Sequence, residues 1–306
     1  MNILKGKNIL IIGAHGMLAT DCIKLFSREN ASLHLADLKE EAPNLWSSLP
    51  YYQVDLSDSQ SVAKLLAAAD VDWIVNCAAF TAVDLAESER EAAFAVNDKG
   101  VENLASAAAT KGSKVCHIST DYVFGGSAPH RAHNTPFSEN DDTAPCGVYG
   151  QSKFAGEQQL RKLLPDAHLI LRTSWLFGAG GPNFVVTMIK LGKELEEIKV
   201  VNDQTGSPTW TGWLAEVIRD LIAQDVKGTF HASSEGNITW HDFAAEIFSR
   251  TGSNIKLSSQ STEQMGRPAP RPVFSTMDTS KLEKVLGREC PNWKSTLDDY
   301  LKEAGY

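Results

Sequence analysis

Short runs of apolar, β-branched residues alternate with longer segments of helical periodicity through the first half of the chain. The apolar runs predict strands and the periodic segments predict helices. The expected strands are 8–12, 32–36, 51–54, 72–76, 114–118 and 169–172, and the expected helices are 17–28, 59–69, 87–111 and 148–164. Such alternation is typical of βαβ units with right-handed crossovers. The pattern therefore predicts an α/β fold with a doubly wound, parallel Rossmann-type sheet.

Beyond residue 172 the pattern is mixed. Helices are expected at 184–193, 212–223, 241–250 and 294–303, with strand-like runs at 198–201 and 228–231. We expect a dinucleotide-binding domain over 1–172, to which a segment at about 202–232 returns. Residues 173–201 and 233–306 are expected to form a smaller C-terminal substrate-binding lobe. The segments 125–147 and 258–276, rich in Pro, Ser and charged residues, are expected to be binding loops.

Composition narrows the class of protein. The chain has 306 residues, of which 42% are hydrophobic and 22% charged, so it can bury a large core. A net charge of −9 argues against nucleic-acid partners and against an anionic membrane surface. Apolar runs stay well short of the ~20 residues that span a membrane. Five scattered cysteines without metal spacing, and a first segment unlike a secretory signal, indicate a cytoplasmic location.

A glycine-containing loop follows the first expected strand. It carries Gly13, Gly16 and Ala19 in the spacing G-x-x-G-x-x-A, directly before a helix. Glycines allow a tight turn and a close approach of the backbone to a pyrophosphate at the positive end of the helix. The alternative is an ordinary strand–turn–helix connection. The position of the glycine loop at the start of a series of βαβ units favours a dinucleotide site.

Two carboxylates are expected near the adenosine end of that site. Asp37 ends the second strand, 24 positions after Gly13, where a carboxylate can bind the adenosine ribose. Its charge would repel a 2′-phosphate, which favours NADH, whereas Lys39 would partly offset that repulsion. The choice between NADH and NADPH therefore stays open. Asp55 follows the third strand and is expected at the adenine side.

Three residues suit the reduction of a ketone. Tyr149 and Lys153 lie four positions apart on one face of a helix, and Thr120 ends a strand. A phenol can give a proton to the carbonyl oxygen, and Thr120 can orient that carbonyl. An ammonium ~5 Å from the phenolate would lower the tyrosine pKa by about two units, at an effective dielectric of ~20. Lys153 could also bind the nicotinamide ribose.

Several stretches together resemble the extended short-chain dehydrogenase/reductase superfamily, and within it the dTDP-4-dehydrorhamnose reductase family. The resemblance covers nearly the whole chain. The stretches begin at Asn76 (NCAAFTAVD), Ser119 (STDYVF), Tyr149 (YGQSKFAGE), Arg172 (RTSWLFG), Asp203 (DQTGSPT) and Arg271 (RP). Such a protein would reduce the 4-keto group of a dTDP-linked sugar with NADH or NADPH.

The resemblance also implies roles for individual residues. It implies cofactor contacts from Gly16, Met17, Leu18, Asp55, Leu56, Ala78 and Ala79, and substrate contacts from Thr120, Asp121 and Trp175. Phe80 and the Gly125-Gly126 pair depart from the family pattern. In the Pro-rich segment, Arg267 or Arg271 could clamp a diphosphate, and either could instead be a surface residue.

Other features of the sequence give weaker evidence about function. His130 and His133 have no acidic or cysteine neighbours in the sequence, so we expect no metal site there. Mg²⁺ at a dimer contact occurs in the family, but no carboxylate cluster supports it here, and a homodimer is possible. Trp210, Trp213 and Trp240 are expected in the core or at an interface, and the acidic run 194–197 at a solvated helix end.

Two other functions remain open. A nucleotide-sugar 4-epimerase or dehydratase would share the fold, although dehydratases of this superfamily follow the threonine with an Asp-Glu pair, and this chain has Asp121-Tyr122. A non-catalytic cofactor-binding subunit, similar to the β subunit of methionine adenosyltransferase, would also share it. The presence of Thr120, Tyr149 and Lys153 together favours an enzyme.

Overall fold

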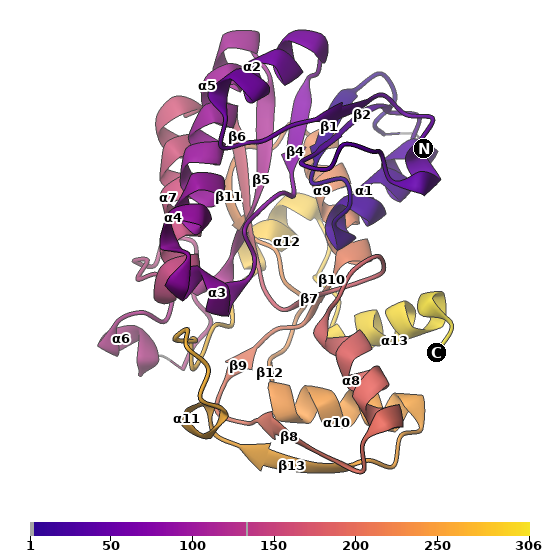
Figure 1. Cartoon of the computed structure of the whole chain (residues 1–306), viewed down its shortest axis with the longest axis vertical. Coiled ribbons are helices and arrows are strands. Elements are labelled where there is room, and N and C mark those ends of the chain that lie inside the picture. The colour runs from indigo at the N-terminus through magenta and orange to yellow at the C-terminus, as the bar shows by residue number, and fades with distance from the viewer. Residues whose placement is uncertain (1–2, 133) are drawn as a thin grey trace.

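The computed structural model describes residues 3–132 and 134–306, and its centre is a seven-stranded parallel sheet (Figure 1). The strands are β1 (Asn8–Ile12), β2 (Ser32–Asp37), β3 (Tyr51–Gln53), β4 (Trp73–Asn76), β5 (Lys114–Thr120), β6 (His168–Thr173) and β11 (Gly228–His231). Their order is β11-β6-β5-β4-β1-β2-β3, so the direction of winding reverses between β1 and β4. This confirms the predicted doubly wound fold, and it places a switch point, where such sheets bind ligands, beside β1.

Helices cover both faces of the sheet. One face carries α1 (Met17–Arg28), α9 (Thr211–Ala223) and α12 (Ser280–Leu286), and the other carries α2 (Ser59–Ala68), α5 (Gly100–Lys111) and α7 (Gly147–Leu163). Side chains of β1 alternate between the two hydrophobic clusters, with Ile9 and Ile11 in one and Leu10 and Ile12 in the other. Strands buried on both faces are continuously apolar, which is why the short apolar runs predicted them well.

The prediction of one helix over 87–111 is wrong. The segment contains the end of α3 (Val83–Ser88), then α4 (Arg90–Phe94), a π-helical turn η2 (Ala95–Lys99) and α5. The wider turn buries Asn97, whose amide accepts from the Phe80 N–H at 2.9 Å and donates to the Phe80 carbonyl at 3.0 Å. It also donates to the Ser152 hydroxyl at 3.0 Å. The turn therefore joins the loop after β4 to helix α7. Such π-helical turns are frequent at functional sites.

A second, smaller core lies below the sheet in Figure 1. It is formed by α8 (Phe184–Glu194), α10 (Trp240–Thr251) and α13 (Trp293–Ala304), next to the strand pair β8 (Glu197–Val201) and β13 (Lys256–Gln260). Short pairs join β7 (Leu176–Phe177) to β10 (Thr209–Trp210) and β9 (Thr205–Gly206) to β12 (Ile238–Thr239). Short helices interrupt the two expected loops: α6 (Ala128–Arg131) and α11 (Thr262–Met265).

The segment expected to return to the main sheet contains α9, which packs against α1, and β11, which pairs with β6. Helix α12 was expected in the smaller lobe, but its Leu282 packs into the first cluster of the main sheet. The proposed domain boundaries stay predictions. Trp213 lies in that same cluster, as expected of a core residue.

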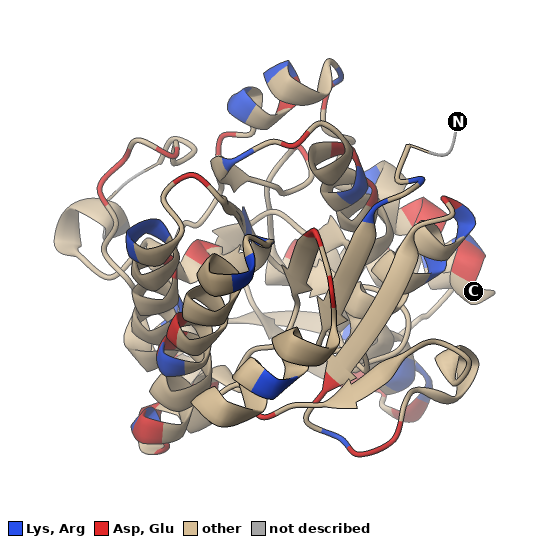
Figure 2. Cartoon of the chain, turned by 90° about the horizontal axis from the view of Figure 1, so that it is seen from above, with Lys and Arg blue, Asp and Glu red and all other residues tan. Residues whose placement is uncertain are grey.

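Charged residues are interspersed, blue with red, on the helices and loops around the sheet (Figure 2). This distribution agrees with the acidic net charge of −9. Among the described residues, every helix is too short or too polar to cross a lipid bilayer.

A buried ionic network holds α7 to the sheet. Glu157 accepts from Arg172 through both carboxylate oxygens, at 2.9 and 2.8 Å, from Arg161 at 2.9 Å, and from the Ser119 hydroxyl at 2.5 Å. These hydrogen bonds hold the pKa of Glu157 below its usual value, although burial alone would raise it. The network thus ties the helix to β5 and β6 at once.

We predict that Glu157→Gln destabilises the fold by about 3–5 kcal/mol, because it leaves a buried guanidinium without its charge partner. The free energy of unfolding in urea measures this. The control is Glu102→Gln, which breaks the solvent-exposed pair with Lys99 and should cost less than about 1 kcal/mol. Equal effects of the two substitutions would contradict a stabilising role for the buried network.

Candidate active site

The glycine loop lies at the carboxyl edge of the sheet, between β1 and β4. Gly13 has a left-handed φ of +85°, and a Cβ there would lie 2.8 Å from the amide nitrogen of Ala78. Gly16 caps α1 and has no side chain to accept hydrogen bonds from the first amides of the helix. Those amides, on Met17 and Leu18, are therefore suited to an anion such as a pyrophosphate. The residues present fit a bound dinucleotide.

Asp37 lies at the end of β2 and faces this loop. Its carboxylate accepts from the amide of His15 at 3.0 Å and from the amide of Lys39 at 3.3 Å, and it lies 3.3 Å from Nδ1 of His15. Beside it is a hollow of about 670 Å³ whose lining includes His15, Lys39 and Trp46. The structure thus brings Asp37 and Lys39 together beside the glycine loop, and their role at an adenosine stays a prediction. The sequence reasoning missed His15, although its place between the two loop glycines was a usable signal.

Asp55 and Leu56 follow β3 at the start of α2. The carboxylate of Asp55 is engaged by the amide and hydroxyl of Ser57, at 2.9 and 2.7 Å. The carbonyl of Leu56 accepts from Asn103 at 2.9 Å, and Cβ of Leu56 would lie 3.0 Å from a Cβ at Gly100. These contacts fix the backbone of the turn. An adenine bound here would therefore be contacted by the backbone of this turn more than by the carboxylate of Asp55.

Thr120 ends β5, and Asp121 begins the short turn η3 (Asp121–Val123). Both are buried, and the Thr120 hydroxyl donates to Asp121 at 3.1 Å and accepts from the Tyr122 amide at 3.2 Å. Burial raises the pKa of Asp121 to about 6, against the effect of its hydrogen bonds. A carboxyl that titrates so close to neutrality is typical of functional sites.

Helix α7 presents Tyr149 and Lys153 to the same region. A Cβ at Gly150 would overlap the carbonyl oxygen of Tyr122, so only glycine lets the helix approach η3 this closely. The side chain of Glu87 accepts from the first-turn amide of Val148 at 2.8 Å and supports the end of the helix. The rings of Tyr149 and Tyr122 meet edge to face at 5.5 Å. Helix α7 thus brings Tyr149 to Thr120 at the end of β5, and Lys153, one turn along the helix, to His117 in the same strand.

The pKa of the phenol shifts in the opposite direction to the one expected. Burial raises the pKa of Tyr149 to about 12, the charge of Asp121 adds to the rise, and a hydrogen bond with Thr120 opposes it. The prediction of a lowered phenol pKa is therefore wrong for the protein alone, because burial outweighs any effect of Lys153. The reason is that removal from water and a neighbouring carboxylate both disfavour the phenolate.

Lys153 is only 2% exposed, and its ammonium group lies 3.2 Å from Nε2 of His117 on β5. Burial lowers the pKa of Lys153 to about 8, while Glu157 and Cys77 act to raise it. Burial and the neighbouring Lys153 hold the pKa of His117 well below its usual value. The sequence reasoning missed His117, because a histidine inside an apolar strand gives no catalytic pattern.

Trp175 and Arg271, which are expected to contact the substrate, lie in unlike surroundings. Trp175 adopts a left-handed φ of +47°, a strained conformation for tryptophan, and stacks on Trp240 at 3.5 Å. The guanidinium of Arg271 pairs with both oxygens of Asp84, at 3.0 and 2.9 Å, and Arg267 lies 3.2 Å from the same carboxylate. The structure therefore holds Arg271 in an ion pair, while Trp175 is half-buried and Trp240 serves as its stacking partner.

No cluster of three or more potential metal ligands occurs in residues 3–132 and 134–306. His130 accepts from the Gly125 amide at 3.2 Å and packs against Phe124 and Phe137. His133 lies outside the described residues. The surroundings of His130 are those of a packing residue.

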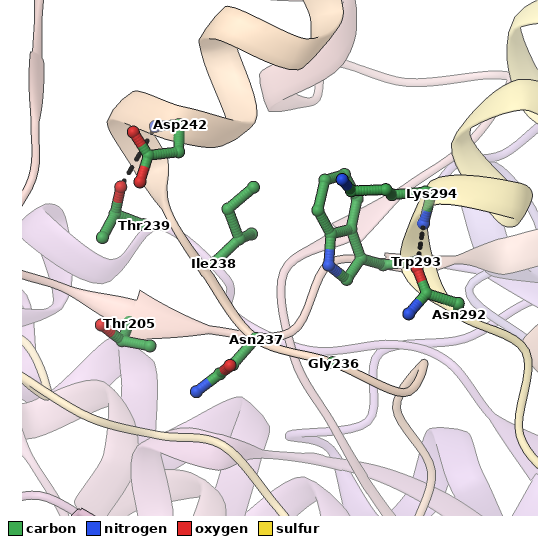
Figure 3. Close-up of a pocket in the computed structure, with 9 residues that line it drawn as sticks. All are labelled: Thr205, Gly236, Asn237, Ile238, Thr239, Asp242, Asn292, Trp293 and Lys294. Atoms are coloured by element: carbon green, nitrogen blue, oxygen red, sulfur yellow. Dashed lines mark hydrogen bonds between the residues drawn. The ribbon is translucent and has the colours of Figure 1, made fainter.

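A larger hollow, of about 800 Å³, lies in the smaller lobe (Figure 3). It is lined by Thr205, Gly236, Asn237, Ile238, Thr239, Asp242, Asn292, Trp293 and Lys294. Figure 3 shows Asp242 and Lys294 on opposite sides of this hollow. Its lining includes none of the catalytic candidates, so we assign the chemistry to the carboxyl edge of the sheet.

Taken together, the sheet and the glycine loop define an α/β protein of the Rossmann type, with polar groups gathered at the switch point. The chain belongs to the family described as RmlD substrate binding domain, whose model matches residues 7–305. Relatives of known name include a dTDP-4-dehydrorhamnose reductase from Streptomyces griseus, 36% identical over 95% of this chain and 91% of the relative. The Escherichia coli protein of that name is 40% identical over 82% and 86% of the two chains.

Solved structures that resemble this chain include proteins of the same name. A dTDP-4-dehydrorhamnose reductase from Clostridium acetobutylicum matches with a TM-score of 0.88 and 36% identity, over 98% of this chain and all of that one. The Bacillus anthracis reductase, solved in complex with NADP, matches with a TM-score of 0.87 and 36% identity, over 97% and 99%. A UDP-glucose 4-epimerase from Thermotoga maritima, 16% identical with a TM-score of 0.81, shares the fold.

We predict that Gly13→Ala weakens dinucleotide binding at least about tenfold, because the new Cβ would meet the backbone of Ala78 and displace the loop. Dissociation constants for NADH and NADPH measure this. The matched control is Gly6→Ala, where φ is +81° and nothing lies within 4 Å of the added Cβ. Gly6→Ala introduces the backbone strain alone, so its dissociation constants for both dinucleotides should be unchanged. Unchanged binding in Gly13→Ala would mean that the cofactor binds elsewhere.

Proposed function

We propose that this chain is an NAD(P)H-dependent oxidoreductase that reduces the 4-keto group of a dTDP-4-dehydro-6-deoxy sugar, converting dTDP-4-dehydrorhamnose to dTDP-L-rhamnose. The observation that carries the proposal is the contact of Tyr149 with Thr120 at the carboxyl end of β5, with Lys153 one turn along α7 and the glycine loop at the same edge of the sheet. The names of the relatives support the substrate, and the relative solved with NADP supports the cofactor.

A dinucleotide held by the glycine loop would supply the hydride for the carbonyl carbon, and the residues of this chain must supply a proton to the oxygen. Tyr149 is the proton donor. With a pKa of about 12 it stays protonated throughout the neutral range, and the alkoxide formed by reduction is a stronger base than a phenolate. The high pKa therefore suits a proton donor in the direction of reduction. Thr120, hydrogen-bonded to Tyr149, orients the carbonyl.

Lys153 stabilises the phenolate that the proton transfer leaves behind. Its pKa of about 8 keeps most of the population charged at neutral pH. The network of Glu157 and Arg172 anchors the next turn of the same helix and so fixes the direction of the lysine side chain. Because Lys153 is almost fully buried, water screens its charge little.

The outer residues are proposed to bind the nucleotide sugar. Trp175, backed by Trp240, offers a flat apolar surface to the base. Arg271 would reach the diphosphate only by leaving Asp84, or by sharing its donors between the two. Asp121, buried beside Thr120, faces the sugar. Gly13, Gly16, Met17, Leu18, Asp37, Asp55, Leu56, Ala78 and Ala79 are proposed as the cofactor contacts.

Net reduction is favoured over epimerisation or dehydration. A dehydratase needs a second carboxylate beside Asp121, and Tyr122 occupies that position with a pKa raised by burial. A non-catalytic subunit would have no use for a buried ammonium next to a phenol. A homodimer and a cytoplasmic location remain predictions.

We predict that Tyr149→Phe lowers kcat by about 10²–10⁴-fold and leaves the dinucleotide dissociation constant within about twofold, because only the transferable proton is lost. Loss of NADPH or NADH absorbance with dTDP-4-dehydro-6-deoxy-L-mannose measures turnover.

The matched control is Tyr52→Phe, which removes a hydroxyl bound to His34 at 3.2 Å on strand β3 and should leave kcat unchanged. Full turnover in Tyr149→Phe would remove the phenol from the mechanism. Binding of the dinucleotide without absorbance loss in the natural protein would favour a regulatory subunit, and product formation without stoichiometric cofactor oxidation would favour an epimerase.

A further inference from the structure

Two buried polar side chains, Asn76 and His117, lie in a line behind the candidate catalytic lysine. Strands β4 and β5 pair in a register that sets Asn76 beside His117. The Asn76 amide nitrogen lies 3.1 Å from Nδ1 of His117, and Nε2 of the same ring lies 3.2 Å from Nζ of Lys153. Asn76 and His117 are fully buried. The histidine therefore bridges the sheet and the lysine on α7.

The hydrogen bonds determine which nitrogen of His117 carries the proton. The side-chain oxygen of Asn76 accepts from the Ala78 amide at 3.2 Å, so its NH₂ group faces the ring. An NH₂ group can only donate, so Nδ1 must accept. A neutral imidazole that accepts at Nδ1 carries its proton at Nε2. That proton points at Lys153.

This tautomer distinguishes between the two forms of the lysine. An ammonium has only donors, so it would set an N–H against the N–H of His117. A neutral amine has a lone pair and can accept the hydrogen bond. The low pKa of His117, caused by burial and by Lys153, keeps the ring neutral and so keeps the arrangement in place.

We propose that His117 is a positioning residue that, with its tautomer fixed by Asn76, stabilises the neutral amine of Lys153 and so lets this lysine return a proton to Tyr149 after each turnover. The proposal rests on the proposed role of Tyr149. In the step, one N–H bond of the ammonium breaks and the phenolate gains an O–H bond, so two opposite charges cancel. The amine then regains a proton from the bulk solvent, so each turnover consumes one solvent proton, which replaces the one delivered to the sugar oxygen.

The direction of the transfer agrees with the surroundings of both groups. The pKa of about 8 for Lys153 lies below the value of about 12 for Tyr149, so the proton moves to the stronger base. Two other groups act on Lys153: Glu157, one turn along α7, and Cys77, which follows β4, both of which raise its pKa. Arg172 neutralises much of the charge of Glu157.

The sign of the pH dependence follows. The ammonium form is present below a pH of about 8 and is lost above it, so turnover should fall along an alkaline limb in that region. Without the N–H of His117 the neutral amine is less stable, and the pKa of Lys153 rises. In His117→Met we expect the alkaline limb of kcat to move up by about half to one pH unit, the effect of one hydrogen bond.

The test is the pH profile of kcat at saturating NADPH and keto sugar. The matched control is His168→Met, a buried histidine at the start of β6 whose ring contacts the carbonyl of Leu164 at 2.6 Å; its limb should stay in place. If the alkaline limb of kcat in His117→Met lay at the same pH as in the natural protein, or at a lower pH, the proposal would be overturned.

A second measurement needs no variant. Nitrogen-15 NMR of the histidines in the natural protein should show His117 neutral, with its proton on Nε2 and a bare Nδ1 at pH 7. A proton on Nδ1 would overturn the proposal even if His117→Met fails to fold. Full activity of Tyr149→Phe would instead refute the proposed function, and the tautomer measurement would be unaffected by that result.

Discussion

The close contact of helix α7 with the turns η3 and η2 is the constraint on which the rest of the site depends. Glycines make it possible at two points: a Cβ at Gly150 would overlap the carbonyl of Tyr122, and one at Gly156 would overlap the carbonyl of Asn97. The contact gathers groups from distant parts of the chain around the end of β5. Protein interiors are packed too densely to absorb an added methyl group at such a contact without movement of the backbone.

Burial changes the pKa values of the ionisable groups around that contact in different directions. It keeps the phenol of Tyr149 protonated and brings the ammonium of Lys153 close to its titration point. Glu157 remains charged because Arg172 and Arg161 compensate its removal from water. The same low-dielectric region thus anchors the helix through one pair of charges and prepares two other groups for proton transfer.

Sequence patterns predicted the sheet well because strands such as β1 and β4 are short, mostly apolar and buried on both faces. The patterns also single out Thr120, Tyr149 and Lys153 as candidates, because strand ends and helical spacing do not depend on knowledge of packing. They failed where tertiary contacts decide. The π-helical turn at Asn97 follows from its bonds to the loop after β4, and the ion pair of Arg271 with Asp84 joins residues 187 positions apart. His117 was missed because folding alone brings it to its polar partners, Asn76 on β4 and Lys153 on α7.

The most direct test is a crystal structure of the protein with oxidised dinucleotide and dTDP-L-rhamnose. The account predicts the sugar 4-hydroxyl within hydrogen-bond distance of both Tyr149 and Thr120, with the nicotinamide ribose at Lys153 and the pyrophosphate on the loop of Gly13 and Gly16. Product bound elsewhere, such as in the hollow of the smaller lobe, or a 4-hydroxyl out of reach of Tyr149, would contradict it.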